Sequence, residues 1–225
     1  MSMPFYVAPE QMMKDRADYA RKGIARGRAL IALQYIDGIA LIAENPSNTL
    51  RKISEIYDRI AFAGVGRYNE FDQLRVSGVR AADLKGYQFS RLDVDARGLA
   101  NQYAQILGQT FTHEMKPLEV EILVAEVGLT PEQDQLFHIM YDGTVIDEHR
   151  FTVLGGDMET IRGRMAERFV AGSNLQDAVK FAHQALSTTD LPINSSELEV
   201  AVLTRSSTRR CFSRLSEATI TQYLV

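Results

Sequence analysis

A basic helical pattern that runs directly into an apolar hairpin, within residues 9–58, constrains this chain more than any other feature. Pro9 suits the first position of a helix, where its missing N–H would lack a partner in any case, and Glu10 lies near the positive end of the helix dipole. Apolar residues recur at helical spacing in only a thin stripe: Met13, Ala17, Ala20 and Ile24. Packing on one core alone would not hold such a helix, so we expect it to lie between subunits.

The charge of this helix differs from the charge of the whole chain. From Glu10 to Arg28, six basic residues face three acidic ones, whereas the 225-residue chain has a formal net charge of −4 at pH 7. The overall charge argues against a dedicated nucleic-acid binder. The local excess of positive charge is the part that a functional interpretation must explain.

The apolar residues after the helix predict a hairpin. Residues 29–35 form a near-continuous apolar run, Asp37 and Gly38 supply a dipeptide favoured in type I′ turns, and residues 39–44 are apolar again. We expect this hairpin to be central in a sheet and covered on both faces.

Strands and helices are expected to alternate along the rest of the chain. Further strands are predicted over 60–66, 119–127, 136–141, 145–149, 151–154 and 198–203, and helices over 68–76, 159–169, 175–186 and 217–224. Another long helix is expected after an N-cap at Asp93 or Asp95 and before Pro117. Groups of antiparallel strands followed by helices predict an α+β fold with two stacked sheets between helix layers.

Length and composition limit the class of protein. A chain of 225 residues without a Pro/Gly/Ser-rich linker favours one domain. The beginning of the chain, MSMPFYVA, lacks a signal-peptide pattern, and no apolar stretch approaches the ~18 residues of a membrane span, so we expect a soluble, cytoplasmic protein. The single cysteine, Cys211, excludes internal disulfides and is interpreted as a small residue in a strand.

Motifs for cofactors, metals and nucleophiles are weak. Gly64 and Gly66 begin a glycine pattern, but Asn69 stands where a dinucleotide loop needs its third glycine. Gly155-Gly156 is interpreted as a turn before an N-cap at Asp157. The histidines have no metal-ligand spacing, and they are His113, His138, His149 and His183. We therefore expect no metal, no cofactor and no catalytic nucleophile.

Longer segments carry a specific resemblance. They are PEQMMKDRADYARKGIARGR, IAENPS, LRKISEIYDRIAFAGVGRYNEFDQLR, LANQYAQILGQTFT, KPLEVEILVAEVG, YDGTVIDE, SELEVAVL and RRCFSRL. In this order, and over essentially the whole chain, they resemble the α-type subunits of the actinobacterial 20S proteasome. The resemblance implies the four-layer α/β/β/α sandwich of N-terminal-nucleophile hydrolases.

The resemblance also implies that this chain is catalytically silent. In the family, catalysis belongs to the β subunit, whose N-terminal threonine is the nucleophile and uses its own amino group as base. Gly27 and Arg28 stand where that threonine would be, behind a whole helix. Lys52 aligns with the lysine that assists the β nucleophile, so it must serve another purpose here.

Three features of the family carry over to residues of this chain. Residues 1–8 match the gate that closes the axial pore, and a domain over 9–225 follows it; the gate residues are Met1, Ser2, Met3, Pro4, Phe5, Tyr6, Val7 and Ala8, with Pro9 as the turn residue. The helix from Pro9 to about Arg26, with its Tyr19-Ala20-Arg21 motif, matches the segment that supports the gate and contacts the neighbouring subunit. Lys52, Gly66 and Tyr19 match the pocket between adjacent subunits, where the C-terminal carboxylate of an activator docks.

The function implied is a gated ring. In this interpretation seven copies form a ring on the proteasome β subunits, and the ring docks a hexameric AAA ATPase or another ring activator. Unfolded or tagged proteins enter through its pore. Nucleic acid and membrane are not expected partners. One alternative is an active N-terminal-nucleophile amidohydrolase or peptidase of the same fold, and another is an oligomeric binding module without a protease partner. Two loops, after Val127 and before Ser195, are shorter than the family's, and the ending Gln222-Tyr223-Leu224-Val225 resembles that of the activators by coincidence.

Overall fold

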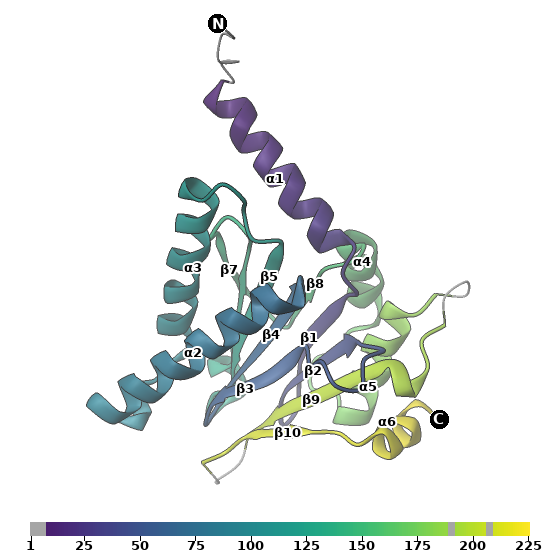
Figure 1. The fold of residues 1–225 in the computed structure, drawn as a ribbon. Helices are drawn as coiled ribbons and strands as arrows, with labels where there is room; N and C mark the ends of the chain where they lie inside the picture. Colours follow the sequence, from purple (N-terminus) through teal and green to yellow (C-terminus); the bar gives the residue numbers. More distant parts are fainter. Residues whose placement is uncertain (1–7, 189–191, 206–208) are drawn as a thin grey trace, which may run out of the picture.

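The computed structural model describes residues 8–188, 192–205 and 209–225. Within these residues two antiparallel sheets stack face to face, and helices cover both outer faces (Figure 1). The α-helices are α1 (Pro9–Ala25), α2 (Tyr68–Gln88), α3 (Ala96–His113), α4 (Met158–Arg168), α5 (Leu175–Leu186) and α6 (Glu217–Leu224). The strands are β1 (Leu30–Tyr35), β2 (Gly38–Glu44), β3 (Ile53–Tyr57), β4 (Ile60–Gly66), β5 (Val120–Glu126), β6 (Gln135–Ile139), β7 (Val145–Glu148), β8 (Phe151–Leu154), β9 (Leu198–Thr204) and β10 (Phe212–Arg214).

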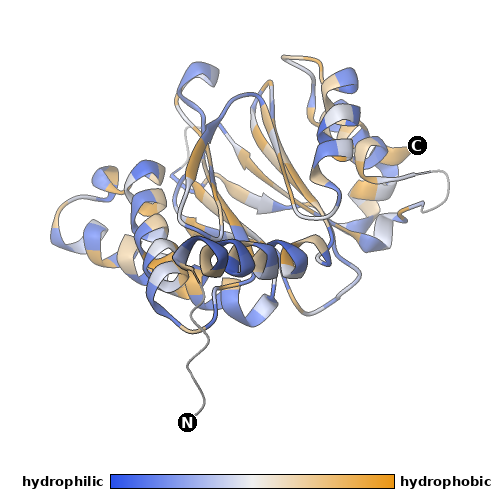
Figure 2. Cartoon of the chain, turned by 90° about the horizontal axis from the view of Figure 1, so that it is seen from above, coloured by the Kyte–Doolittle hydropathy of each residue, from blue (hydrophilic) through white to orange (hydrophobic). Residues whose placement is uncertain are grey.

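The two sheets separate three apolar cores. One sheet has the order β10-β9-β2-β1-β8, and the other has the order β3-β4-β5-β6-β7. Apolar residues of β1, β2 and β9 meet those of β4 and β5 between the sheets, while α2 and α3 cover one outer face and α4, α5 and α6 cover the other. Figure 2 shows the strands between the helix layers as mainly hydrophobic. This arrangement confirms the predicted α/β/β/α sandwich.

Helix α1 covers one end of the core between the sheets. Its buried residues, Ala20 and Ile24, belong to that core, and the rest of the helix extends away from the sandwich (Figure 1). Pro9 is the first helical residue, as predicted. None of the helices in the described part of the chain combines the length and the apolar composition that a membrane crossing requires.

Several predicted elements need correction. The helix predicted over 68–76 continues to Gln88, because Gly78 allows close packing on α3: a Cβ built on Gly78 would lie 1.7 Å from Tyr103 Oη. The edge strands β3 and β10 were not predicted, since β3 has a mixed burial pattern and β10 has only three residues. Cys211 is buried but lies just before β10 rather than within it.

The first hairpin forms with a different turn from the predicted type I′. Tyr35 pairs with Gly38, which makes Ile36 and Asp37 the central residues. A type I′ turn needs positive φ at both central residues, whereas among the described non-glycine residues only Arg150 has a positive φ, of 70°. The hairpin was therefore predicted correctly and its turn type was wrong.

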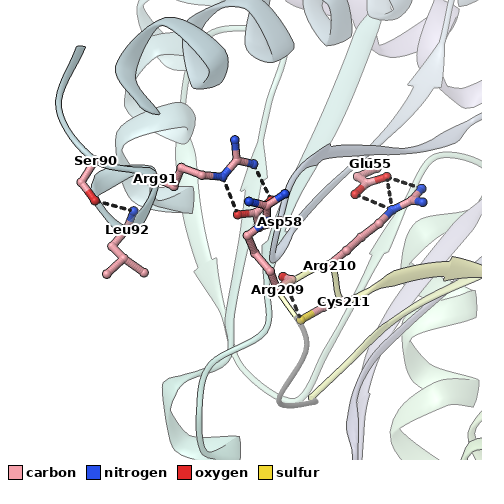
Figure 3. A network of polar contacts seen from close by, with 8 residues as sticks. All are labelled: Glu55, Asp58, Ser90, Arg91, Leu92, Arg209, Arg210 and Cys211. Atoms are coloured by element: carbon pink, nitrogen blue, oxygen red, sulfur yellow. Dashed lines mark hydrogen bonds and ion pairs between the residues drawn. The ribbon is translucent and has the colours of Figure 1, made fainter. Parts of the chain in front are cut away.

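A network of arginines and carboxylates fixes the turn between β3 and β4. Asp58 accepts two hydrogen bonds from Arg91, at 3.0 and 2.6 Å, and Arg209 approaches the same carboxylate at 3.6 Å. Arg210 pairs with Glu55 of β3 (Figure 3). The pairing holds the pKa of the Asp58 carboxyl below its usual value, mainly through the Arg91 hydrogen bonds. These contacts tie the segment before β10 to the other sheet.

Candidate functional site

Lys52 lies directly before β3 and reaches the start of β1. Its Nζ donates a 2.6 Å hydrogen bond to the backbone carbonyl of Arg28, in the link between α1 and β1. The Arg28 guanidinium in turn pairs with the Glu44 carboxylate at the end of β2. The ammonium group is therefore held at the place where the first strand begins.

Burial lowers the pKa of Lys52 to about 8, because a half-buried ammonium loses part of its hydration. The carboxylates of Glu44 and Glu199 act against this effect, and the guanidinium of Arg28 adds to it. At pH 7 the group remains mainly a cation. It can therefore offer a charge-assisted hydrogen bond to an anion.

Gly66 borders the same link from the other side. It ends β4 with φ of +99°, and a Cβ there would lie 2.0 Å from the carbonyl oxygen of Glu119, so only glycine fits. A Cβ built on Gly27 would lie 3.1 Å from the Gly66 nitrogen. The structure thus brings Gly66 and Lys52 to the same short segment, residues 27 and 28.

Tyr19 lies in a separate groove on the outside of α1. Its side chain is 45% exposed, and Lys116 Nζ lies 5.9 Å from its ring centroid. The groove has a volume of about 420 Å³ and is lined by Met12, Asp15, Arg16, Tyr19, Met115, Lys116 and Pro117. Within one subunit the structure therefore does not bring Tyr19 into contact with Lys52 or Gly66.

The groove and the link are connected through Glu119. The Glu119 carboxylate pairs with Lys116 Nζ at 2.9 Å and with Arg67 Nε at 2.6 Å, and its carbonyl accepts the Arg67 N–H at 3.0 Å. These residues were not predicted as part of the site, because a charged residue next to a strand has no distinctive local pattern. The one unusual residue in the sequence was Gly23, a glycine inside the predicted helix. In the structure Gly23 faces the Glu119 side chain.

Of the predicted gate residues, the structure describes only the last two. Ala8 precedes α1 and its carbonyl accepts the N–H of Met12 at 3.0 Å, and Pro9 opens the helix. Met1 to Val7 lie outside the described residues.

The start of β1 contains no hydroxyl or thiol. Gly27 and Arg28 follow the 17 residues of α1, and the backbone nitrogen of Arg28 is part of a peptide bond. Within the described residues no three His, Cys, Asp or Glu side chains are grouped as a metal site. The buried His138 instead bonds to Glu121, with 3.2 Å between Nε2 and Oε2.

Comparisons with known proteins agree with this geometry. The family model described as "Proteasome subunit" matches residues 24–203. Relatives named "Proteasome subunit alpha" include one from Acidimicrobium ferrooxidans, 63% identical over 96% of this chain and 93% of the relative, and one from Thermomonospora curvata, 53% identical over 100% and 98%. A third, from Kineococcus radiotolerans, is 56% identical over 96% and 95%. The chain belongs to the proteasome subunit family and, within it, to the α type.

Proposed function

We propose that this chain is a non-catalytic α-ring subunit of the 20S proteasome core particle, which forms the gated axial pore and docks activators. The observation that carries the proposal is the start of β1. Threonine chemistry needs a hydroxyl beside a free amine at that position, and here a helix precedes Gly27 and Arg28. Lys52 is hydrogen-bonded to a carbonyl instead of activating a nucleophile.

The same lysine supports a docking role. A half-buried ammonium beside an exposed backbone turn suits the C-terminal carboxylate of a partner, and such a contact contributes roughly 1.5–3 kcal/mol. Gly66 would supply backbone in the same pocket, and Tyr19 would line it from an adjacent subunit, because its groove lies on another face of its own subunit.

The wider assembly follows from this role. We propose a heptameric ring of this chain on a ring of β subunits, in the cytoplasm, with a hexameric AAA ATPase or another ring activator above it and unfolded or tagged proteins as cargo. Residues 1–8 form the gate, and residues 9–225 form the domain that carries it. The alternative of an active amidohydrolase is not favoured, because within the described residues Gly27 and Arg28 at the start of β1 carry no hydroxyl or thiol.

Co-expression with a β subunit tests the proposal. We expect a stacked-ring particle by electron microscopy, peptidase activity that depends on the β subunit, and no peptide hydrolysis by this chain alone. Lys52→Ala should weaken the binding of each activator C-terminal tail about tenfold or more. Lys180→Ala on α5 should leave this affinity unchanged. Turnover by the isolated chain, or normal activator response in Lys52→Ala, would contradict the proposal.

A further inference from the structure

Glu199 of β9 places a buried carboxylate directly behind Lys52. Ala201 and Leu203 of β9 face the core between the sheets, and alternation along a strand turns Glu199 to the same side. The Glu199 side chain is only 4% exposed. Burial of a carboxylate costs free energy unless hydrogen bonds satisfy it. The hydrogen bonds that the structure gives to Glu199 come from Lys52 and from groups close to it.

The Glu199 carboxylate accepts hydrogen bonds from the backbone at Lys52. Oε2 accepts the N–H of Lys52 at 2.9 Å, and Oε1 accepts the N–H of Ile53 at 3.2 Å. Arg214 of β10 pairs with Oε1 and also donates to the carbonyl of Ile53. The carbonyl of Lys52 itself accepts the N–H of Gly64 at 3.0 Å. The peptide groups on both sides of the Lys52 Cα are therefore fixed.

Asn45 connects the Glu199 carboxylate to the loop before Lys52 by hydrogen bonds. Its Nδ2 donates to Glu199 Oε2 at 2.7 Å and to the carbonyl of Leu50 at 2.8 Å. Since β9 and β3 belong to different sheets, Glu199 joins the two sheets at the root of the lysine side chain.

We propose that Glu199 is the positioning residue of the docking lysine: it sets the backbone from which Lys52 projects and, together with Glu44, places negative charge beside the lysine side chain. The inference rests on the proposed docking function. Arg28, Glu44, Glu199 and Arg214 are the charged groups around Lys52, and of these Glu44 and Glu199 favour the ammonium form. Without the Glu199 charge, burial would remove the proton from Lys52 at lower pH.

The test measures binding of a synthetic peptide that ends in Gln-Tyr-Leu with a free carboxylate. Fluorescence anisotropy follows its binding to the assembled α/β particle between pH 6 and 9.5. In the parent, affinity should fall as the pH rises through about 8, because the Lys52 cation is lost. In Glu199→Gln the loss of peptide affinity should occur at lower pH. A displacement of about one pH unit reduces the protonated fraction of Lys52 at pH 8 roughly fivefold.

A matched control and a second variant keep the test decisive. Glu126→Gln also replaces a carboxylate that accepts a backbone N–H, from Ala96 at 2.7 Å; this carboxylate is only partly buried, but it lies away from Lys52, so the change should leave the pH profile unchanged. Arg214→Gln removes the cation paired with Glu199 and should move the fall to higher pH. Particle integrity is checked for each variant by electron microscopy.

The outcomes separate the two proposals. Opposite displacements by Glu199→Gln and Arg214→Gln support the inference, and unchanged pH profiles in both overturn it. If Lys52→Ala binds the peptide as well as the parent does, the docking function itself fails, whatever the other variants show.

Discussion

Gly23 of α1 lies against the carboxylate of Glu119: a Cβ built on Gly23 would stand 2.2 Å from Glu119 Oε1. Glu119 cannot simply turn away, because Arg67 and Lys116 hold its carboxylate. This contact fixes the last turn of α1 against the strand edge where β5 begins. It is one of the contacts that hold a helix with only two buried residues, Ala20 and Ile24.

Gly23→Ala should therefore destabilise the chain by about 1–3 kcal/mol, because the methyl group overpacks this contact. Gly163→Ala in α4 is the matched control, since nothing lies within 4 Å of its added Cβ. Its higher helix propensity should make it neutral or stabilising by roughly 0.5–1 kcal/mol. Chemical denaturation measures both, and equal stabilities of the two variants would refute the assigned contact.

Tyr103→Phe should be neutral or stabilising by up to about 1 kcal/mol. Tyr103 is 1% exposed, and among the described residues its hydroxyl has no hydrogen-bond partner. Tyr35→Phe is the contrast, because the Tyr35 hydroxyl bonds to Thr204 Oγ1 at 3.1 Å and its loss should cost about 0.5–1.5 kcal/mol. Thermal unfolding of both variants checks the pair, and a larger loss for Tyr103→Phe than for Tyr35→Phe would contradict it.

Lys52→Met should change stability in a pH-dependent way. The pKa of Lys52 falls from 10.5 to about 8 on folding, so between these values the unfolded chain binds more protons than the folded one. The penalty for burying the cation is complete below pH 8 and disappears as the pH rises toward 10.5. The melting temperature of the variant minus that of the parent should therefore fall over this window.

Lys116→Met provides the comparison for that experiment. Burial lowers the pKa of Lys116, but hydrogen bonds to Glu70 and Glu119 outweigh this and raise it. Both folded and unfolded chains then keep the Lys116 proton over most of the window, so the corresponding difference should stay flat. A flat difference for Lys52→Met as well would mean that burial does not control its titration.

Removal of residues 1–8 should speed hydrolysis of long peptides by the assembled particle more than hydrolysis of short ones. An apolar arm ahead of Pro9 can close an axial pore through contacts with its symmetry mates, and its loss leaves the β active sites unaltered. Peptidase assays with substrates of increasing length measure the effect. Unchanged rates at every length, in intact particles, would remove the gate assignment.

The elements with a clear period were predictable from sequence, and those without one were not. Residues 175–186 place Ala178, Val179, Ala182 and Ala185 on one face, and α5 has the predicted bounds. In β3, Ser54 and Glu55 interrupt the apolar pattern because the strand lies at a sheet edge, and so the strand was missed.

The residues of the candidate site could be predicted from local sequence only in part. Lys52 was proposed from a family resemblance, since a lone lysine before a strand has no chemical signature. Glu199 could not be predicted, because 147 residues separate it from the N–H that it accepts. Only the pairing of β9 with β2 brings that carboxylate behind the lysine.

The position of α1 ahead of β1 also bears on how this chain can evolve. A single change of Arg28 to threonine would supply a hydroxyl, but its nitrogen would still be bonded to Gly27. A free amine would require cleavage of the peptide bond between Gly27 and Arg28, after which α1, with Ala20 and Ile24 buried in the core between the sheets, would be held only by noncovalent contacts. Threonine chemistry at this position would thus require both a new side chain and a cleavage of the backbone. The helix ahead of β1 therefore means that no single substitution in this chain can create that chemistry.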